Sequence, residues 1–132
     1  MGTVKYLLDT HTFLWVALDD SKLSDTAKKA ISDKNVDIFV SPVTAYEILN
    51  KHRTGKLPDY MYVAENFHEV FYKLAANELL ISIEHFHYAA KFEWSHRDPF
   101  DRMLAAQAKI ENMTLITNDP AFNDLLWLSR LW

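Results

Sequence analysis

Residues 4–18 read VKYLLDTHTFLWVAL, a short apolar segment followed by one acid and a longer segment with helical spacing. Val4 to Leu8 is short, with β-branched and aromatic side chains, which predicts a buried strand. Apolar residues then recur at helical spacing from Thr10 to Leu18. Only Asp9 separates the two elements, so this stretch predicts a strand that passes directly into a helix.

The same alternation of short strands and helices continues along the chain. Further strands are predicted at 37–40, 79–83 and 114–117. Helices are predicted after the N-cap residue Ser24, over 42–53, 60–76, 84–94 and 98–110, and briefly after Asp119-Pro120. The apolar end, 125–132, is expected to form a final strand or a docked tail. Strands that alternate with helices need crossover connections, so we predict an α/β fold of three layers, α/β/α, with a short, mainly parallel central sheet.

The composition limits the class of protein. A length of 132 residues predicts a single domain over 1–132. Hydrophobic residues make up 49% and charged residues 24%, which excludes a disordered chain, and no apolar run is long enough to predict a membrane span. Cysteine is absent, which excludes disulfides and a thiolate metal site and agrees with a cytoplasmic location. The net charge of -4 excludes a strongly basic nucleic-acid binder.

Several acidic residues fall where the predicted sheet would have the carboxyl ends of its strands. In a parallel α/β sheet this edge is where ligands bind. The residues are Asp9, Glu47, Asp98, Asp101 and Asp119. Two carboxylates about 4 Å apart repel by about 4 kcal/mol at an effective dielectric constant near 20, so either some are protonated or a cation holds them. Oxygen ligands without thiolates favour Mg²⁺ or Mn²⁺, and a carboxylate–metal site that bridges to phosphate indicates phosphodiester hydrolysis.

Each acid also has a purely structural interpretation. Asp98 and Asp119 both precede a proline and are ideal helix N-caps, and Asp101 stands where the reciprocal partner of a capping box would stand. A glutamate such as Glu47 more commonly faces solvent. Asp9 ends a buried strand, where an unpartnered acid is costly, and this favours a functional role. Capping and metal ligation are compatible, because a carboxylate at a helix N-terminus can serve both.

Four segments resemble the motifs of the PIN-domain family, and specifically of its VapC-type toxins from toxin–antitoxin pairs. They are YLLDTHTFLW at 6–15, SPVTAYEILNKHRTGKL at 41–57, HRDPFDRMLAAQA at 96–108 and TLITNDPAF at 114–122. The match spans nearly the whole chain in the right order, and the combination of the first and third segments is specific. Thr44 stands where a serine is often found, and the tail beyond Phe122 matches no motif.

The resemblance implies a PIN-like fold and a Mg²⁺- or Mn²⁺-dependent endoribonuclease that acts as the toxin of a type II pair. It implies that Asp9 and Asp101 are the main metal ligands, and that Asp119 and Asp98 bind directly or through water. Glu47 would position or deprotonate the attacking water. Two hydroxyl residues match positions that line the site in the family, Thr10 and Thr117. RNA and a cognate antitoxin are the partners that the resemblance implies.

Because the chain is acidic overall, basic side chains near the acids are candidate RNA phosphate contacts. Lys51 and Arg53 lie at the end of the helix that carries Glu47, and Arg97 and Arg102 flank the acidic stretch 98–101 of the third motif. Basic residues at a helix C-terminus are also favoured by the helix dipole, which is the alternative for the first pair. The many aromatic residues of 60–72 and of the C-terminal tail favour an interface, in a homodimer or beneath an antitoxin segment.

Other classes stay open on the residues alone. A phosphotransferase of the haloacid-dehalogenase type needs a second aspartate two residues after the first, where this chain has His11. A response-regulator receiver domain needs a lysine after a late strand, which Thr117 to Asp119 do not offer. A non-catalytic protein of the same fold would bind RNA or a partner without cutting, and the complete set of acids argues against it.

Overall fold

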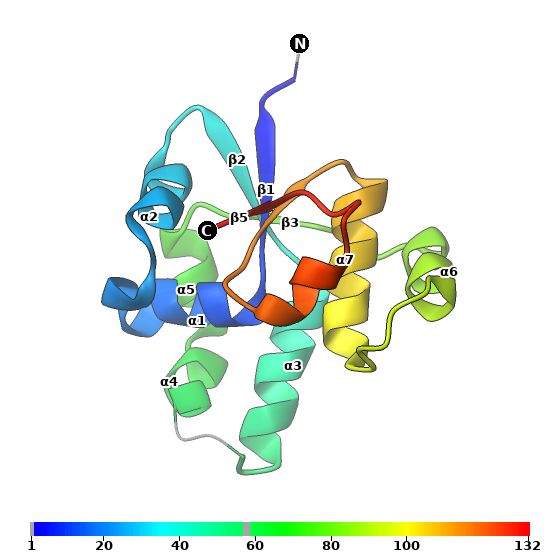
Figure 1. Ribbon diagram of the computed structural model, residues 1–132. Helices are drawn as coiled ribbons and strands as arrows, with labels where there is room; N and C mark the ends of the chain where they lie inside the picture. The colour runs from blue at the N-terminus through cyan, green and yellow to red at the C-terminus, as the bar shows by residue number, and fades with distance from the viewer. Residues whose placement is uncertain (1, 57–58) are drawn as a thin grey trace.

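The computed structural model describes residues 2–56 and 59–132. The strands β1 (Val4–Leu8), β2 (Val36–Val40), β3 (Asn77–Glu78), β4 (Thr114–Ile116) and β5 (Arg130–Leu131) form one sheet of order β3-β2-β1-β4-β5. All the pairings in this sheet are parallel. β1 runs through the middle of the molecule (Figure 1), where Tyr6 pairs with Ile38 of β2 and Thr114 of β4. The expected α/β class with a parallel sheet is therefore confirmed.

Helices cover both faces of the sheet. Along the chain they are α1 (Thr10–Leu18), α2 (Asp25–Ser32), α3 (Pro42–Arg53), α4 (Asp59–Glu65), α5 (Phe67–Lys73), α6 (Ile83–Lys91) and α7 (Pro99–Ile110). The short 3₁₀ helices η1 (Asp20–Lys22) and η2 (Pro120–Asp124) lie in the connections. In Figure 1, α6 and α7 lie to the right of the sheet, and α1, α2 and α5 lie to the left.

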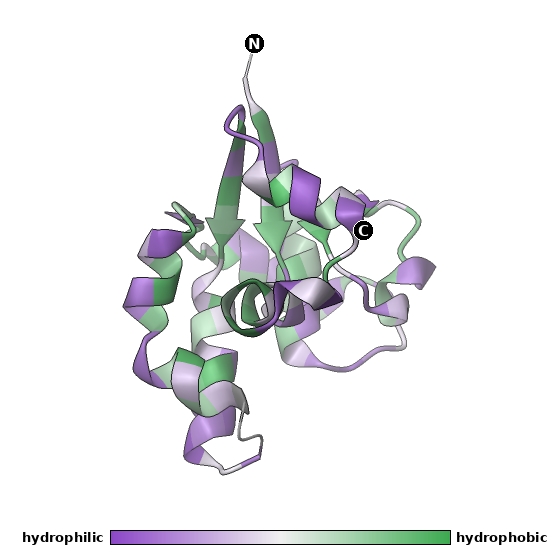
Figure 2. Cartoon of the chain, turned by 90° about the vertical axis from the view of Figure 1, so that its left-hand side faces the viewer, coloured by the Kyte–Doolittle hydropathy of each residue, from purple (hydrophilic) through white to green (hydrophobic). Residues whose placement is uncertain are grey.

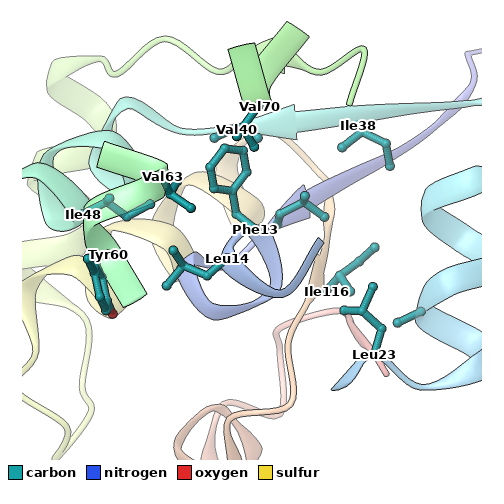
Figure 3. Close-up of a cluster of buried hydrophobic side chains, with 12 residues drawn as sticks. Phe13, Leu14, Leu23, Ile38, Val40, Ile48, Tyr60, Val63, Val70 and Ile116 are labelled. Carbon is teal, nitrogen blue, oxygen red and sulfur yellow. The ribbon is translucent and has the colours of Figure 1, made fainter. Parts of the chain in front are cut away.

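One apolar cluster packs α1, α2 and α5, the helices to the left of the sheet in Figure 1, against the strands. Leu8 of β1 and Ile116 of β4 contribute from the strands, and Phe13 is completely buried. Figure 3 shows the Phe13 ring extending toward Val40 and Val70. Full burial of a large apolar side chain stabilises the fold by about 1.5–3 kcal/mol relative to exposure, so this cluster anchors α1 directly behind Asp9.

A second cluster packs α7 on the opposite face. Leu7 of β1 and Leu115 of β4 meet Leu104 and Ala108 of α7. Successive strand residues point to opposite faces, and Leu7 and Leu8 are both fully buried in different clusters. This explains why β1 ends in two consecutive apolar residues without alternation, and Figure 2 shows the hydrophobic colouring at the ends of the strands.

The structure corrects two predicted elements. The segment 60–76 is two helices, because the chain leaves helical geometry at Asn66, with φ -123° and ψ 28°. The strand predicted at 79–83 is wrong: β3 ends at Glu78, and only the Leu79 N–H extends the pairing, by a bond to the carbonyl of Val40 at 3.0 Å. Ser82 and His85 form a capping box that starts α6 at Ile83, so the apolar run is divided between an edge strand and a helix.

The remaining boundaries agree closely with the sequence. α6 ends at Lys91, three residues before the expected Trp94. The C-terminal tail forms β5, the first of its two expected structures. Leu57, the last residue of the second motif, lies outside the described residues. Within 2–56 and 59–132, no helix combines the length and the apolar character that a bilayer-spanning segment needs.

Candidate active site

Asp9 connects the central strand to the first helix. Its N–H donates to the carbonyl of Ile116 at 3.2 Å, and its Oδ1 accepts the N–H of Thr12 at 2.8 Å. Oδ2 accepts the hydroxyl of Thr117. The residue is 4% exposed, and burial raises the pKa of Asp9 above its ordinary value although the bonds from Thr117 and Thr12 lower it. A buried carboxylate of this kind is stabilised in its charged form by a nearby cation.

Glu47 points inward from α3 and is 4% exposed, so the solvent-facing alternative is wrong. Its Oε1 accepts the Thr10 hydroxyl at 2.6 Å, and its Oε2 accepts the Lys51 ammonium at 2.6 Å. Lys51 also lies over the Tyr60 ring, 5.6 Å from its centroid. Burial lowers the pKa of Lys51, but the hydrogen bond and charge of Glu47 raise it to a greater extent. Lys51 therefore stays charged and neutralises Glu47 instead of facing outward alone.

Asp98 and Asp101 lie at the start of α7. Asp98 is the N-cap, and its Oδ1 accepts the N–H groups of Phe100 at 2.8 Å and of Asp101 at 3.1 Å. Asp101 makes no reciprocal capping-box bond among the described residues, and its Oδ2 instead lies 2.7 Å from Nε2 of His96. The pKa of Asp101 is raised to about 6, mainly by burial and also by the charges of Asp98, Asp119 and Glu47, although the hydrogen bond from His96 lowers it.

Asp119 lies just beyond β4 and caps η2 by accepting the N–H of Ala121 at 2.9 Å. Its own N–H donates to the Thr117 hydroxyl oxygen at 3.0 Å. Since the same hydroxyl donates to Asp9, Thr117 links the two acids. Asp9 and Asp119 also line one depression in the surface, together with His11, Trp15, Asn118 and Pro120.

The fold thus gathers acids from four distant segments at the carboxyl edge of the sheet. Thr117 connects Asp9 to Asp119, and the Asp101 carboxyl feels the charges of Asp98, Asp119 and Glu47. Both threonines expected to line the site donate a hydroxyl hydrogen bond to an acid: Thr10 donates to Glu47, and Thr117 donates to Asp9.

The donor set fits a small, hard divalent cation. Carboxylate oxygens predominate, and the chain has no thiolate to favour a softer metal. His96, Asp98 and Asp101 each offer one ligand atom, and these atoms lie within 4.8 Å of one another. His96 was missed in the sequence, although it stands two residues before Asp98 at the head of the third motif.

Arg102 has a different role from the phosphate contact expected from the sequence. Its guanidinium donates to the carbonyl oxygens of Ala89 (2.8 Å), Phe92 (2.5 Å), Trp94 (3.1 Å) and His96 (3.2 Å). It also lies 4.3 Å from the centroid of the Phe92 ring. Arg102 therefore holds the loop between α6 and α7. Arg97 and Arg53 are exposed, and Arg53 bonds to the Asn50 side chain at 2.7 Å.

Solved structures with the same fold come from toxin–antitoxin systems. VapBC2 from Rickettsia felis, bound to a DNA fragment of its promoter, is 17% identical with a TM-score of 0.67, over 98% of this chain and 99% of that chain. VapBC-1 from nontypeable Haemophilus influenzae is 16% identical with a TM-score of 0.68, over 97% of each chain. VapC20 from Mycobacterium tuberculosis, described as a sarcin-ricin loop cleaving toxin, is 13% identical with a TM-score of 0.59, over 92% of this chain and 95% of that chain.

A comparison with curated proteins gave no significant match. At the identities found among solved structures, the likeness demonstrates a common fold. The sequence itself matches the model of the PIN domain over residues 6–127, which includes all the acids of the site. The expected family is thereby confirmed, and the chain belongs to the PIN-domain family.

Proposed function

We propose that this PIN domain is a Mg²⁺- or Mn²⁺-dependent endoribonuclease and the toxin of a type II toxin–antitoxin pair. The observation that carries the proposal is the acid cluster, in which buried Asp9 and half-buried Asp101 both have raised pKa values. Burial raises the pKa of both groups, and neighbouring acids raise that of Asp101 as well, so a divalent cation would stabilise the charged form of both carboxylates. The structural likeness to VapC toxins supports the same activity.

Asp9 and Asp101 would hold the cation, with Asp119 and Asp98 binding directly or through water. When bound, such a cation lowers the pKa of a water molecule and stabilises negative charge on phosphate oxygens. Glu47 is oriented by Thr10 on one oxygen and by Lys51 on the other. In this orientation Glu47 would accept the proton of the attacking water, and the Lys51 ammonium lies beside its other oxygen.

The proposed partners are RNA, an antitoxin and a second copy of the chain. Arg97 and Arg53 are exposed and stay candidates for phosphate contacts. Large apolar side chains stand exposed on α3 and α5, with Tyr46 at 64% and Tyr72 at 72%. A protein partner, either the antitoxin or a homodimer, would bury them. The cytoplasmic location and the single-domain organisation stay predictions.

Removal of divalent metal should abolish RNA cleavage. Purified protein is incubated with total RNA in Mg²⁺, in Mn²⁺ and in excess EDTA, and the fragments are followed on a denaturing gel. We expect cleavage with either metal, a loss of at least about 100-fold in EDTA, and recovery when metal is returned. Cleavage that continues unchanged in EDTA would contradict the proposal. Retention of RNA without cleavage in either metal would favour the non-catalytic alternative.

The metal affinity of the site should fall as the pH drops below about 6. Asp101 has a pKa raised from 3.8 to about 6, so at lower pH it holds a proton that a cation must displace. We expect the Mn²⁺ affinity to fall by up to about tenfold per pH unit below that value, measured by calorimetric titration between about pH 5 and about pH 7. In the metal-free chain, the contribution of this group to stability is present below pH 3.8 and is lost as pH rises through about 6. A constant Mn²⁺ affinity over this range would contradict the Asp101 assignment.

A further inference from the structure

His96 lies in the loop between α6 and α7 and contacts the acid cluster directly. Its Nε2 is 2.7 Å from Oδ2 of Asp101, and the two side chains are 32% and 19% exposed. An ionised carboxylate only accepts hydrogen bonds, so the imidazole is the donor when Asp101 is charged. Among residues 2–56 and 59–132, no other hydrogen bond reaches the Asp101 carboxylate. One oxygen of Asp101 is therefore engaged, and the other is open to a ligand.

The loop that carries His96 is held by the residue that follows Asp101. Arg102 donates to the carbonyl of His96 at 3.2 Å and to the carbonyls of Phe92 and Trp94. The His96 ring also packs on the Trp94 ring, with centroids 4.7 Å apart. Arg102, in the first turn of α7, thus fixes the loop, and the fixed loop places His96 beside Asp101. This arrangement determines the direction in which the Asp101 carboxylate points.

We propose that His96 is a positioning residue that limits Asp101 to one ligand oxygen and so selects a small octahedral cation over Ca²⁺. The inference rests on the proposed metal-dependent function. With Oδ2 held by His96, Asp101 offers a cation only Oδ1. Mg²⁺ demands octahedral geometry, to which each carboxylate gives one oxygen, whereas Ca²⁺ takes six to eight oxygens and often binds a carboxylate through both. The bond from His96 therefore disfavours the larger ion.

The selectivity of the full-length protein for Mn²⁺ over Ca²⁺ tests this role. Both affinities are measured by calorimetric titration in the wild type, His96→Ala and His96→Gln. We expect His96→Ala to lose about tenfold in Mn²⁺ affinity, because the partners that orient a metal ligand typically contribute 10–100-fold. The Ca²⁺ affinity should hold or rise, so the Mn²⁺/Ca²⁺ ratio falls by at least about tenfold. The glutamine amide can still donate to Asp101, so His96→Gln should keep most of the ratio.

His87→Ala is the matched control, because His87 is exposed on α6 and should leave both affinities unchanged. A ratio that stays at the wild-type value in His96→Ala would overturn the inference. Equal losses of Mn²⁺ and Ca²⁺ affinity, together with a lower Tm, would also overturn it, because they indicate that the substitution loosens the structure in general. Nitrogen coupling in the electron paramagnetic resonance spectrum of Mn²⁺ bound to the wild type would also overturn it, by showing that His96 is itself a ligand.

The same samples separate this inference from the nuclease proposal. If the ratio shifts in His96→Ala but the Mn²⁺-loaded wild type leaves RNA intact, the positioning role stands and the nuclease proposal fails. If the wild type cleaves RNA and the ratio does not shift, only the positioning role fails. Absence of Mn²⁺ binding to the wild type would overturn both.

Discussion

Asp9→Asn should reduce RNA cleavage by at least about 100-fold while the protein stays folded and becomes as stable as the wild type, or more so, in EDTA. The loss is expected because a neutral amide replaces a proposed main metal ligand. The fold is expected to survive because the asparagine oxygen can still accept the Thr12 N–H that caps α1. The stability gain follows from burial, which raises the pKa of Asp9 and thus disfavours its charged form.

Asp25→Asn makes the same chemical change on an exposed residue in the first turn of α2 and should leave cleavage unaffected. Cleavage rates are measured in Mg²⁺ and in Mn²⁺, and Tm values are recorded with EDTA and with each metal. Metal should raise the Tm of the wild type and of Asp25→Asn, but much less that of Asp9→Asn. An Asp9→Asn variant that cuts RNA as fast as the wild type would show that the ligand assignment is wrong.

Arg102→Ala should destabilise the protein by about 2–4 kcal/mol. The substitution removes the charged donor from the carbonyls of Ala89, Phe92, Trp94 and His96, and it also removes the contact with the Phe92 ring. Without the guanidinium, these carbonyl groups lose their hydrogen-bond donor in the folded protein, whereas in the unfolded chain they bond to water. The substitution therefore raises the free energy of the folded state only. Arg102→Lys should recover little of this loss, because one ammonium group cannot reproduce the planar set of guanidinium donors.

The free energy of unfolding is measured by urea titration in EDTA, so that metal binding does not contribute. Arg53→Ala is the matched control: it removes an exposed arginine with one side-chain partner, Asn50, and should change stability by less than about 0.5 kcal/mol. Equal stabilities for Arg102→Ala and Arg53→Ala would refute the role assigned to Arg102. Full stability of Arg102→Lys would show that charge alone, without the guanidinium geometry, holds the loop.

The parts of the site that depend on local rules could be predicted from the sequence. An acid directly after a buried strand identified Asp9, and aspartate before proline identified the caps at Asp98 and Asp119. Each of these signals is contained within a few residues of the chain. The parallel sheet could also be predicted, because a helix between two strands returns the chain to the starting edge of the sheet and the second strand then runs parallel to the first.

Partners from distant segments were beyond the reach of sequence patterns. In the sequence, an arginine beside Asp101 looks the same whether it contacts phosphate or backbone carbonyls. Only the path of the chain from the last turn of α6 to His96 decides that Arg102 contacts carbonyls. The burial of Glu47 likewise depends on Thr10, 37 positions away. The misplaced edge strand has a local reason: an apolar run such as 79–83 satisfies a strand or a helix start equally well, and the Ser82 cap decided for the helix.

The position of β4 beside β1 has a consequence for the order in which a ribosome delivers the chain. Thr117 reaches back over 108 positions to Asp9, and Asp119 follows it, so the last acid of the site is synthesised after all the others. A nascent polypeptide that ends after α3 carries Asp9 and Glu47 but neither Asp101 nor Asp119. If the folded protein cuts RNA, a growing chain that still lacks the segment with Thr117 and Asp119 is harmless to its own message.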